Sequence, residues 1–101
     1  MLLDDQLRNR LPALYSQEAE PDPIVYAKFF LPGTGWTWYV TEGGEQGNDF
    51  LFFGFVSDSG EFTRFRLSEL QAVRDLTGAQ VELDLTFTEG RLTDVVPAPD
   101  Y

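Results

Sequence analysis

The chain has 101 residues, and 7 Lys and Arg stand against 17 Asp and Glu, so its formal net charge is −10. It contains no His and no Cys. This excludes disulfides, thiolate or imidazole catalysis, and metal sites built from those side chains. Hydrophobic residues make up 43% of the chain and aromatic residues 15%, which is enough for a folded core. We expect a single domain over residues 1–101.

The charge and the hydropathy pattern also bear on location and partners. The start of the chain is acidic, unlike a signal peptide, and the longest apolar run, at 50–56, is too short to span a bilayer. We therefore expect a cytoplasmic protein without membrane contact. The negative charge argues against direct binding of nucleic-acid phosphates. It fits either a basic protein partner or a coat that keeps the protein soluble.

The N-terminal segment has the spacing of a short helix. Leu3, Leu7 and Leu11 recur at steps of four residues, which places them on one helical face. Asp4 stands where a carboxylate caps a helix start, and Pro12 stands where a helix has to end. We expect a helix at about 3–11, followed by a Pro-rich acidic loop at 16–23.

The middle of the chain has the pattern of an antiparallel sheet over residues 24–67. Strands are expected at 24–31, 36–42, 50–57 and 61–67, because these runs are rich in aromatic and β-branched residues. The Gly-rich segment at 43–48 is expected to be a flexible turn. Asp58-Ser59-Gly60 is expected to be a tight hairpin turn.

The last third predicts a helix and further strands. Ser68 and Gln71 have the spacing of a capping box, which predicts a helix at 68–76. Residues 81–96 predict strands, with Leu83, Leu85 and Phe87 on one face, and residues 97–101 a loose tail. Together the elements predict an α+β fold, an antiparallel sheet of five or six strands with two short helices.

The tryptophans are the first candidates for a functional site. Trp36 and Trp38 lie two residues apart in an expected strand, so they share one face, and Tyr39 lies on the other. Neighbouring indoles can stack on a base, a sugar or a partner's side chain. Large aromatic residues also commonly form the core of a domain, so both interpretations stay open.

The single lysine is the second candidate. Lys28 lies between apolar residues in an expected strand, where a lysine either pairs with a carboxylate or has a lowered pKa. Glu42 and Asp84 are the expected partners. The alternative is a lysine whose stem covers the sheet while its ammonium group stays in water.

Carboxylates form the third candidate. Glu82 and Asp84 are expected on one strand face, where they could imitate phosphates or hold a divalent cation, or could simply be solvated. Neither the Asp58–Glu61 turn nor any Gly-rich segment has the order of a metal or nucleotide motif, so we assign no catalytic residue, metal ligand or cofactor. The candidates for binding a partner or ligand are Lys28, Trp36, Trp38, Tyr39, Glu42, Glu82 and Asp84.

Several strings of residues resemble a small bacterial family catalogued as a domain of unknown function. The Trp-Thr-Trp-Tyr string at 36–39 is the most specific of them, and the resemblance covers about residues 10–88. The matching residues are Pro12-Ala13-Leu14-Tyr15, Asp22-Pro23-Ile24-Val25, Lys28-Phe29-Phe30 with Pro32, Trp36-Thr37-Trp38-Tyr39 with Thr41-Glu42, Phe52-Phe53-Gly54 with Val56, Leu67-Ser68-Glu69-Leu70, and Glu82 with Asp84. The chain departs from the family pattern at 61–66. Because such proteins occur on plasmids, integrative elements and phages, the resemblance implies an accessory protein of a mobile genetic element.

Three functional hypotheses follow. The first is a non-enzymatic, acidic interaction protein that inhibits a basic nucleic-acid-processing or defence protein. The second is a small ligand- or nucleic-acid-binding module that uses an aromatic sheet face. The third is a carboxylate-based, metal-dependent enzyme, which the lack of His disfavours because few groups remain that titrate near neutral pH.

Overall fold

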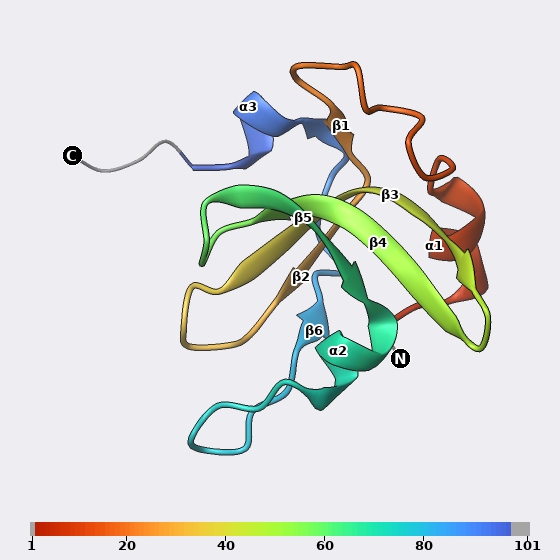
Figure 1. Ribbon diagram of the computed structural model, residues 1–101. Helices are drawn as coiled ribbons and strands as arrows, with labels where there is room; N and C mark the ends of the chain where they lie inside the picture. The colour runs from red at the N-terminus through yellow and green to blue at the C-terminus, as the bar shows by residue number, and fades with distance from the viewer. Residues whose placement is uncertain (1, 98–101) are drawn as a thin grey trace.

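The structure is a computed structural model that describes residues 2–97 (Figure 1). Its elements in chain order are α1 (Asp5–Arg10), β1 (Ile24–Val25), β2 (Ala27–Phe30), β3 (Thr37–Gln46), β4 (Asp49–Val56), β5 (Glu61–Arg66), α2 (Leu67–Ala72), β6 (Glu82–Leu83), β7 (Gly90–Arg91) and α3 (Leu92–Val95). Within this part of the chain, no helix has the length and hydropathy needed to cross a membrane.

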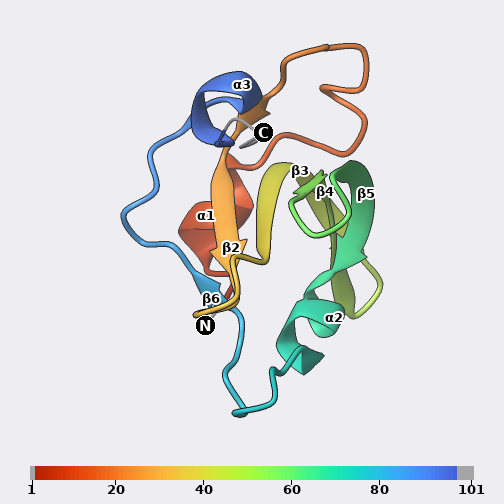
Figure 2. The same cartoon turned by 90° about the vertical axis from the view of Figure 1, so that its left-hand side faces the viewer.

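A five-stranded sheet with the order β5-β4-β3-β2-β6 forms the centre of the fold, and all its pairings are antiparallel. The strands β1 and β7 form a separate antiparallel ribbon. The α+β prediction with an antiparallel sheet is thus confirmed. In Figures 1 and 2 the ribbon and α3 lie at one end of the main sheet, and β6 lies beside β2.

One face of the main sheet, which we call the inner face, carries the core. Alternate residues of the strands, among them Phe29, Val40 and Phe52, are almost completely buried there. The helix α1 packs onto this face with Leu7, and the flanking Leu3 and Leu11 are buried as the leucine spacing predicted. We call the opposite face of the sheet the outer face.

The hairpin of β3 and β4 is longer than expected. Residues 43–46, expected in a flexible turn, continue β3, and the connection shrinks to Gly47 and Asn48. The glycines suit this strand because they allow close packing. A Cβ on Gly43 would stand 2.6 Å from a ring atom of Phe50 and 2.9 Å from Leu11. The glycine-rich composition therefore reflects packing inside a strand, and the prediction of a turn at 43–46 was wrong.

The second helix starts and ends earlier than expected. It spans Leu67–Ala72, and the residue preceding it, Arg66, donates its backbone N–H to Glu69 at 3.2 Å. Ser68 is not the cap. Its hydroxyl donates to Asp49 at 2.5 Å and so fastens the helix to the start of β4. The predicted range 68–76 was therefore wrong at its C-terminal end.

The segment from 73 to 88 consists largely of turns. Asp75 and Asp84 make the same local structure, in which one carboxylate oxygen accepts both the backbone N–H and the hydroxyl of the threonine two residues later. Such a bond competes with strand pairing. The expected strand therefore stops at Leu83, and Leu85, expected on the same strand face as Leu83 and Phe87, is 87% exposed.

The last described element is also different from the prediction. Residues 92–95 form α3 and not a strand, and the side chain and backbone of Thr93 both donate to Asp22. These bonds favour the helical start over an extended chain. Most of the expected loose tail, residues 98–101, lies outside the described residues.

Candidate functional site

The strand register sets a row of side chains across the outer face. Lys28 lies opposite Tyr39, Tyr39 opposite Phe55, and Phe55 opposite Phe62. Residues that lie opposite each other in antiparallel strands point to the same face. The row therefore joins the lysine on β2 to the half-buried Phe55 on β4 and the exposed Phe62 on β5.

Lys28 has a carboxylate partner. Its Nζ lies 3.8 Å from Asp84 Oδ2 and 6.0 Å from the centroid of the Tyr39 ring. Burial raises the pKa of Tyr39 above its ordinary value. Because both members of the Lys28–Asp84 pair are partly exposed, this is a solvated ion pair on the sheet and not an isolated buried lysine.

Glu82 and Asp84, the two carboxylates expected on one strand face, have different surroundings. Asp84 accepts two hydrogen bonds from Thr86, whose hydroxyl is the main cause of the lowered pKa of Asp84. Glu82 is exposed and lies opposite Phe30. Among residues 2–97, no group of three or more Asp or Glu side chains is arranged to hold a metal ion.

The tryptophans do share a face, but it is the inner one. Their rings stack with centroids 4.7 Å apart and an interplanar angle of 27°. Trp38 is buried in the core, and Trp36 packs against it with its Nε1 buried and without a hydrogen-bond partner among residues 2–97. The indoles therefore contribute first to packing, which was the second of the two interpretations.

Glu42 is buried, with 2% of its surface exposed, and it makes two strong backbone contacts. Its Oε1 accepts the N–H of Tyr15 at 2.6 Å, and its Oε2 accepts the N–H of Gln17 at 2.8 Å. The register of β3 against β4 shifts between Val40 and Glu42. A bulge at that point re-aims a side chain, and here the carboxylate meets the loop that follows α1.

A second side chain fastens the same loop. The amide group of Gln17 donates to the backbone oxygens of Ile24 and Thr41 at 2.9 Å, and it accepts the N–H of Ile24 at 2.8 Å. Further along, Asp22 is bound by Thr93 of α3. The loop at 14–23 is thus held at several points although it has no strand pairing, and Figure 2 shows it standing over the ends of β3, β4 and β5.

Tyr15 takes an unusual conformation as a result. Its φ is 72°, the only positive value at a non-glycine residue in the described chain, and the residue is 55% exposed. A bulky side chain in this region costs about 1–2 kcal/mol. The guanidinium of Arg64 lies 5.2 Å from the centroid of the Tyr15 ring and 6.0 Å from that of Phe53.

Two adjoining hollows lie between this loop and the outer face of β3, β4 and β5, and together we call them the outer groove. The smaller encloses about 40 Å³ and the larger about 280 Å³, and they share Glu18 and Phe53. Phe53 stacks on Phe62 with centroids 5.8 Å apart and an interplanar angle of 12°. The other lining residues are Leu14, Tyr15, Glu42 and Arg64 in the smaller hollow, and Gln17, Glu20, Pro21, Pro23, Thr41 and Phe62 in the larger.

Of the seven predicted site residues, only Glu42 lines the outer groove. Its carboxylate is already bound to the backbone of the loop at 14–23. The prediction missed Tyr15, Phe53, Phe62 and Arg64. The hairpin turn at 58–60 gives partial information on these residues, because it fixes which residues of β4 and β5 lie opposite each other and so which of them share a face. The backbone N–H of Tyr15 is bound by Glu42, 27 positions away, so the residues next to Tyr15 in the sequence do not indicate its positive φ.

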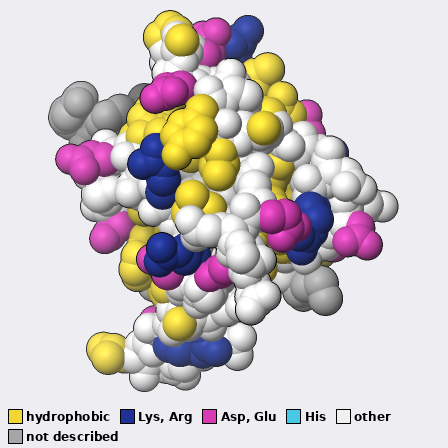
Figure 3. Space-filling model, turned by 45° about the vertical axis from the view of Figure 1, so that its right-hand side comes forward, with side chains coloured by type: hydrophobic (Ala, Val, Ile, Leu, Met, Phe, Trp, Pro, Cys, Tyr) yellow, Lys and Arg dark blue, Asp and Glu magenta, His cyan; other side chains and the backbone are white. Residues whose placement is uncertain are grey.

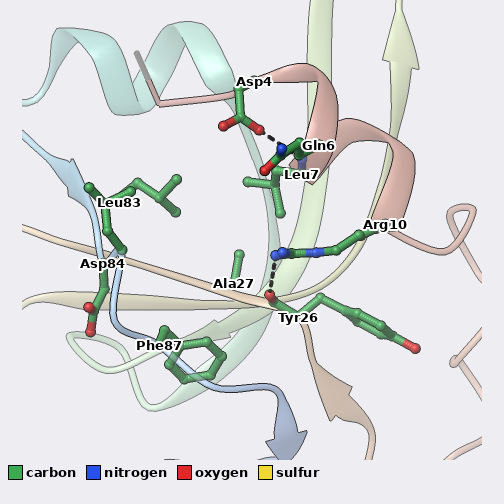
Figure 4. Close-up of a pocket in the computed structure, with 10 residues that line it drawn as sticks. Asp4, Gln6, Leu7, Arg10, Tyr26, Ala27, Leu83, Asp84 and Phe87 are labelled. Atoms are coloured by element: carbon green, nitrogen blue, oxygen red, sulfur yellow. Dashed lines mark hydrogen bonds between the residues drawn. The ribbon is translucent and has the colours of Figure 1, made fainter.

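A further hollow, of about 160 Å³, lies between α1 and residues 83–87 (Figure 4). Arg10 crosses it and donates to the backbone oxygen of Tyr26 at 3.3 Å, and its Nε lies 3.4 Å from Glu89. The carboxylate of Asp84 points away from Arg10 in this view. Since the guanidinium is already engaged at both ends, this hollow serves to join α1 to the C-terminal segment.

Comparison with known proteins places the chain in a family. Residues 2–96 match the family described as protein of unknown function (DUF2958). No curated protein matches the chain, and no solved structure matches it. The match covers nearly the whole sequence and agrees with the resemblance drawn from its motifs, so the chain belongs to the DUF2958 family of proteins of unknown function.

Proposed function

We propose that this protein is a non-enzymatic interaction protein of a mobile genetic element that acts in the cytoplasm on a basic protein. A nucleic-acid-processing or defence protein is the class of partner we infer. One observation carries this proposal: the buried Glu42 accepts the N–H of Tyr15, whose φ is positive, and the exposed ring of Tyr15 lies beside Arg64 at the outer groove, which Phe62 also lines. Unfavourable conformations of this kind persist where the surrounding structure enforces them, and they concentrate at functional sites.

The composition of this surface supports binding to a protein. Tyr and Arg are among the residues that contribute most to binding energy in protein interfaces. Phe62, on the edge strand β5, is 41% exposed and stacks on Phe53. An exposed aromatic cluster with a polar surround is typical of an interaction site.

The charge balance supports a basic partner. Five of the seven cationic side chains form ion pairs within the molecule, namely Arg8, Arg10, Lys28, Arg66 and Arg91. Carboxylates such as Glu18 and Glu61 have no ion pair among residues 2–97. Figure 3 shows Asp and Glu side chains interspersed with Lys and Arg side chains over the visible face, next to exposed hydrophobic groups. The net charge of −10 attracts a basic protein at long range, and the apolar groups then supply local affinity.

The other two hypotheses have less support from the geometry. A ligand site on the tryptophans would have to open the core around Trp38. The residues that line the two hollows of the outer groove include no group of three carboxylates arranged to hold a metal ion.

Affinity capture from a bacterial lysate tests the proposal. The full chain serves as bait at low salt and again at about 0.5 M salt, where the screening length falls to roughly 4 Å. We expect a specific protein rich in Lys and Arg to be enriched at low salt and to be lost at high salt. Recovery of no basic protein on the wild-type bait would overturn the proposal.

A further inference from the structure

We propose that the outer groove binds an extended segment of the basic partner, with an apolar side chain of that segment over Phe53 and Phe62 and an arginine beside Glu18. This inference rests on the proposed function, and it names the part of the partner that is recognised. A protein segment fits this groove because its floor, Phe53 and Phe62, is apolar and its wall carries the carboxylates of Glu18 and Glu20.

The larger hollow of the outer groove has room for an apolar side chain of the partner. The larger hollow encloses about 280 Å³. Its floor is the stacked pair of Phe53 and Phe62, and Pro21 and Pro23 contribute to its wall. A partner residue such as leucine that lies on this floor removes aromatic surface from water, which is the main source of affinity at such a site.

The charges of the groove select a cation. Glu18 lines both hollows, and it has no ion pair among the residues that the structure describes. Glu20 also faces the larger hollow, and its contact with Arg91, at 3.8 Å, is exposed and therefore weak. The one cation that lines the groove, Arg64, is stacked against Tyr15 and Phe53.

The carboxylate of Glu18 decides which cation fits. The guanidinium of Arg64 already lies against the rings of Tyr15 and Phe53, so a cation of the partner pairs with Glu18 and not with these ring faces. A guanidinium pairs with a carboxylate through two N–H groups, whereas an ammonium group acts as a point charge. The partner's cation beside Glu18 is therefore assigned as arginine.

The groove is also prepared for binding before the partner arrives. Glu42 and Gln17 fix the loop at 14–23 through five hydrogen bonds. Asp22 fixes its far end through Thr93. Because little has to be ordered on binding, a short contact is sufficient for measurable affinity.

An NMR titration tests this inference. The ¹⁵N-labelled full chain is mixed with the blocked peptide Gly-Leu-Gly-Arg-Gly, whose leucine and arginine point to the same side when it is extended. We expect saturable shifts of the amide signals of Glu18, Phe53 and Phe62, with a dissociation constant on the order of 1 mM. Replacing the arginine by lysine should weaken binding about threefold, and replacing it by glutamate should weaken it at least about tenfold.

Variants complete the test. Phe62→Ser and Glu18→Gln should each weaken binding of the peptide about five- to tenfold, whereas Asp58→Asn and Leu85→Ser should leave it unchanged. The inference is overturned if shifts do not saturate, if they fall outside the outer groove, if the glutamate peptide binds equally well, or if single-stranded oligothymidylate shifts the same signals more strongly.

The captures separate this inference from the proposed function. If a basic protein is captured equally well by the Phe62→Ser and Glu18→Gln baits, the proposed function holds and the groove inference is wrong. If no basic protein is captured at all, the proposed function is wrong, and the groove inference falls with it whatever the peptide does.

Discussion

Oε1 of Glu42 accepts the backbone N–H of Tyr15 at 2.6 Å and joins a strand in the centre of the sheet to a loop 27 residues earlier in the chain. The carboxylate is buried, and both of its oxygens accept backbone N–H groups of that loop. A buried carboxylate is stable only when such donors surround it. The loop and the bulge of β3 are therefore one structural unit.

The first prediction concerns that unit. Glu42→Gln replaces one accepting oxygen by an amide nitrogen, which leaves a backbone N–H without an acceptor. We expect the free energy of unfolding to fall by about 1–3 kcal/mol, measured by urea denaturation. Glu82→Gln, at an exposed carboxylate, is the matched control and should change stability by less than about 0.5 kcal/mol. Equal effects of the two substitutions would contradict the role assigned to Glu42.

The second prediction concerns the backbone of Tyr15. Its φ of 72° suits glycine and not alanine. Both Tyr15→Gly and Tyr15→Ala remove the ring from Arg64, so their difference reports on the backbone alone. We expect the glycine variant to be more stable than the alanine variant by about 1 kcal/mol, which thermal and urea unfolding can resolve. An alanine variant of higher stability would show that the loop relaxes out of this conformation.

The third prediction concerns Gly54 in the middle of β4. It lies opposite Val40, next to the bulge, and a Cβ at this position would stand 2.0 Å from the backbone oxygen of Tyr39. Because backbone cannot move aside cheaply, we expect Gly54→Ala to destabilise the fold by about 3 kcal/mol or more. Gly44→Ala, whose Cβ would meet only Leu14 at 3.3 Å, is the control. Circular dichroism during urea unfolding measures both.

The fourth prediction concerns acid. The Ser68 hydroxyl, followed by the Phe50 N–H, lowers the pKa of Asp49 below its usual value of 3.8, and the N–H and hydroxyl of Thr93 lower the pKa of Asp22. A lowered folded-state pKa means that the ion contributes stability above pH 3.8, and that this stability is lost as the pH falls through the folded-state pKa.

Carboxyl ¹³C signals should therefore show Asp22 and Asp49 titrating below the ordinary aspartate value of 3.8, and the free energy of unfolding should fall as the pH drops below about 3.8. Asp49→Asn should flatten this acid dependence relative to Asp58→Asn. Titration of Asp49 at or above its usual pKa would show that the Ser68 bond does not persist in solution.

The success of the sequence-based prediction differs between the sheet and the site. Their aromatic and β-branched residues predicted β4 and β5, and burial alternates along β4. Alternation failed at Leu85, where the bonds from Thr86 to Asp84 turn the chain out of the strand. The strand prediction was also wrong at Leu92–Val95, where Asp22, far away in sequence, stabilises a helix start.

The candidate site depended on contacts of this distant kind. Lys28 forms an ion pair with Asp84, one of its two expected partners, because β2 pairs with β6. Glu42 is bound to a loop, a contact that no residue spacing indicates. Trp36 and Trp38 were correctly placed on one face, but which face is buried depends on where α1 packs. Spacing predicts the face of a residue, and only the packing of the other elements decides what covers it.

In the loop at 14–23, some residues hold the loop in place and others only face the outer groove. Its anchors are the backbone of Tyr15 and the side chains of Gln17 and Asp22. The side chains of Glu18 and Pro21 face the outer groove and take no part in these anchors. Substitutions at 18 and 21 can therefore change the lining of the outer groove while the anchors stay intact, so this exposed surface can vary among related proteins without a change of fold.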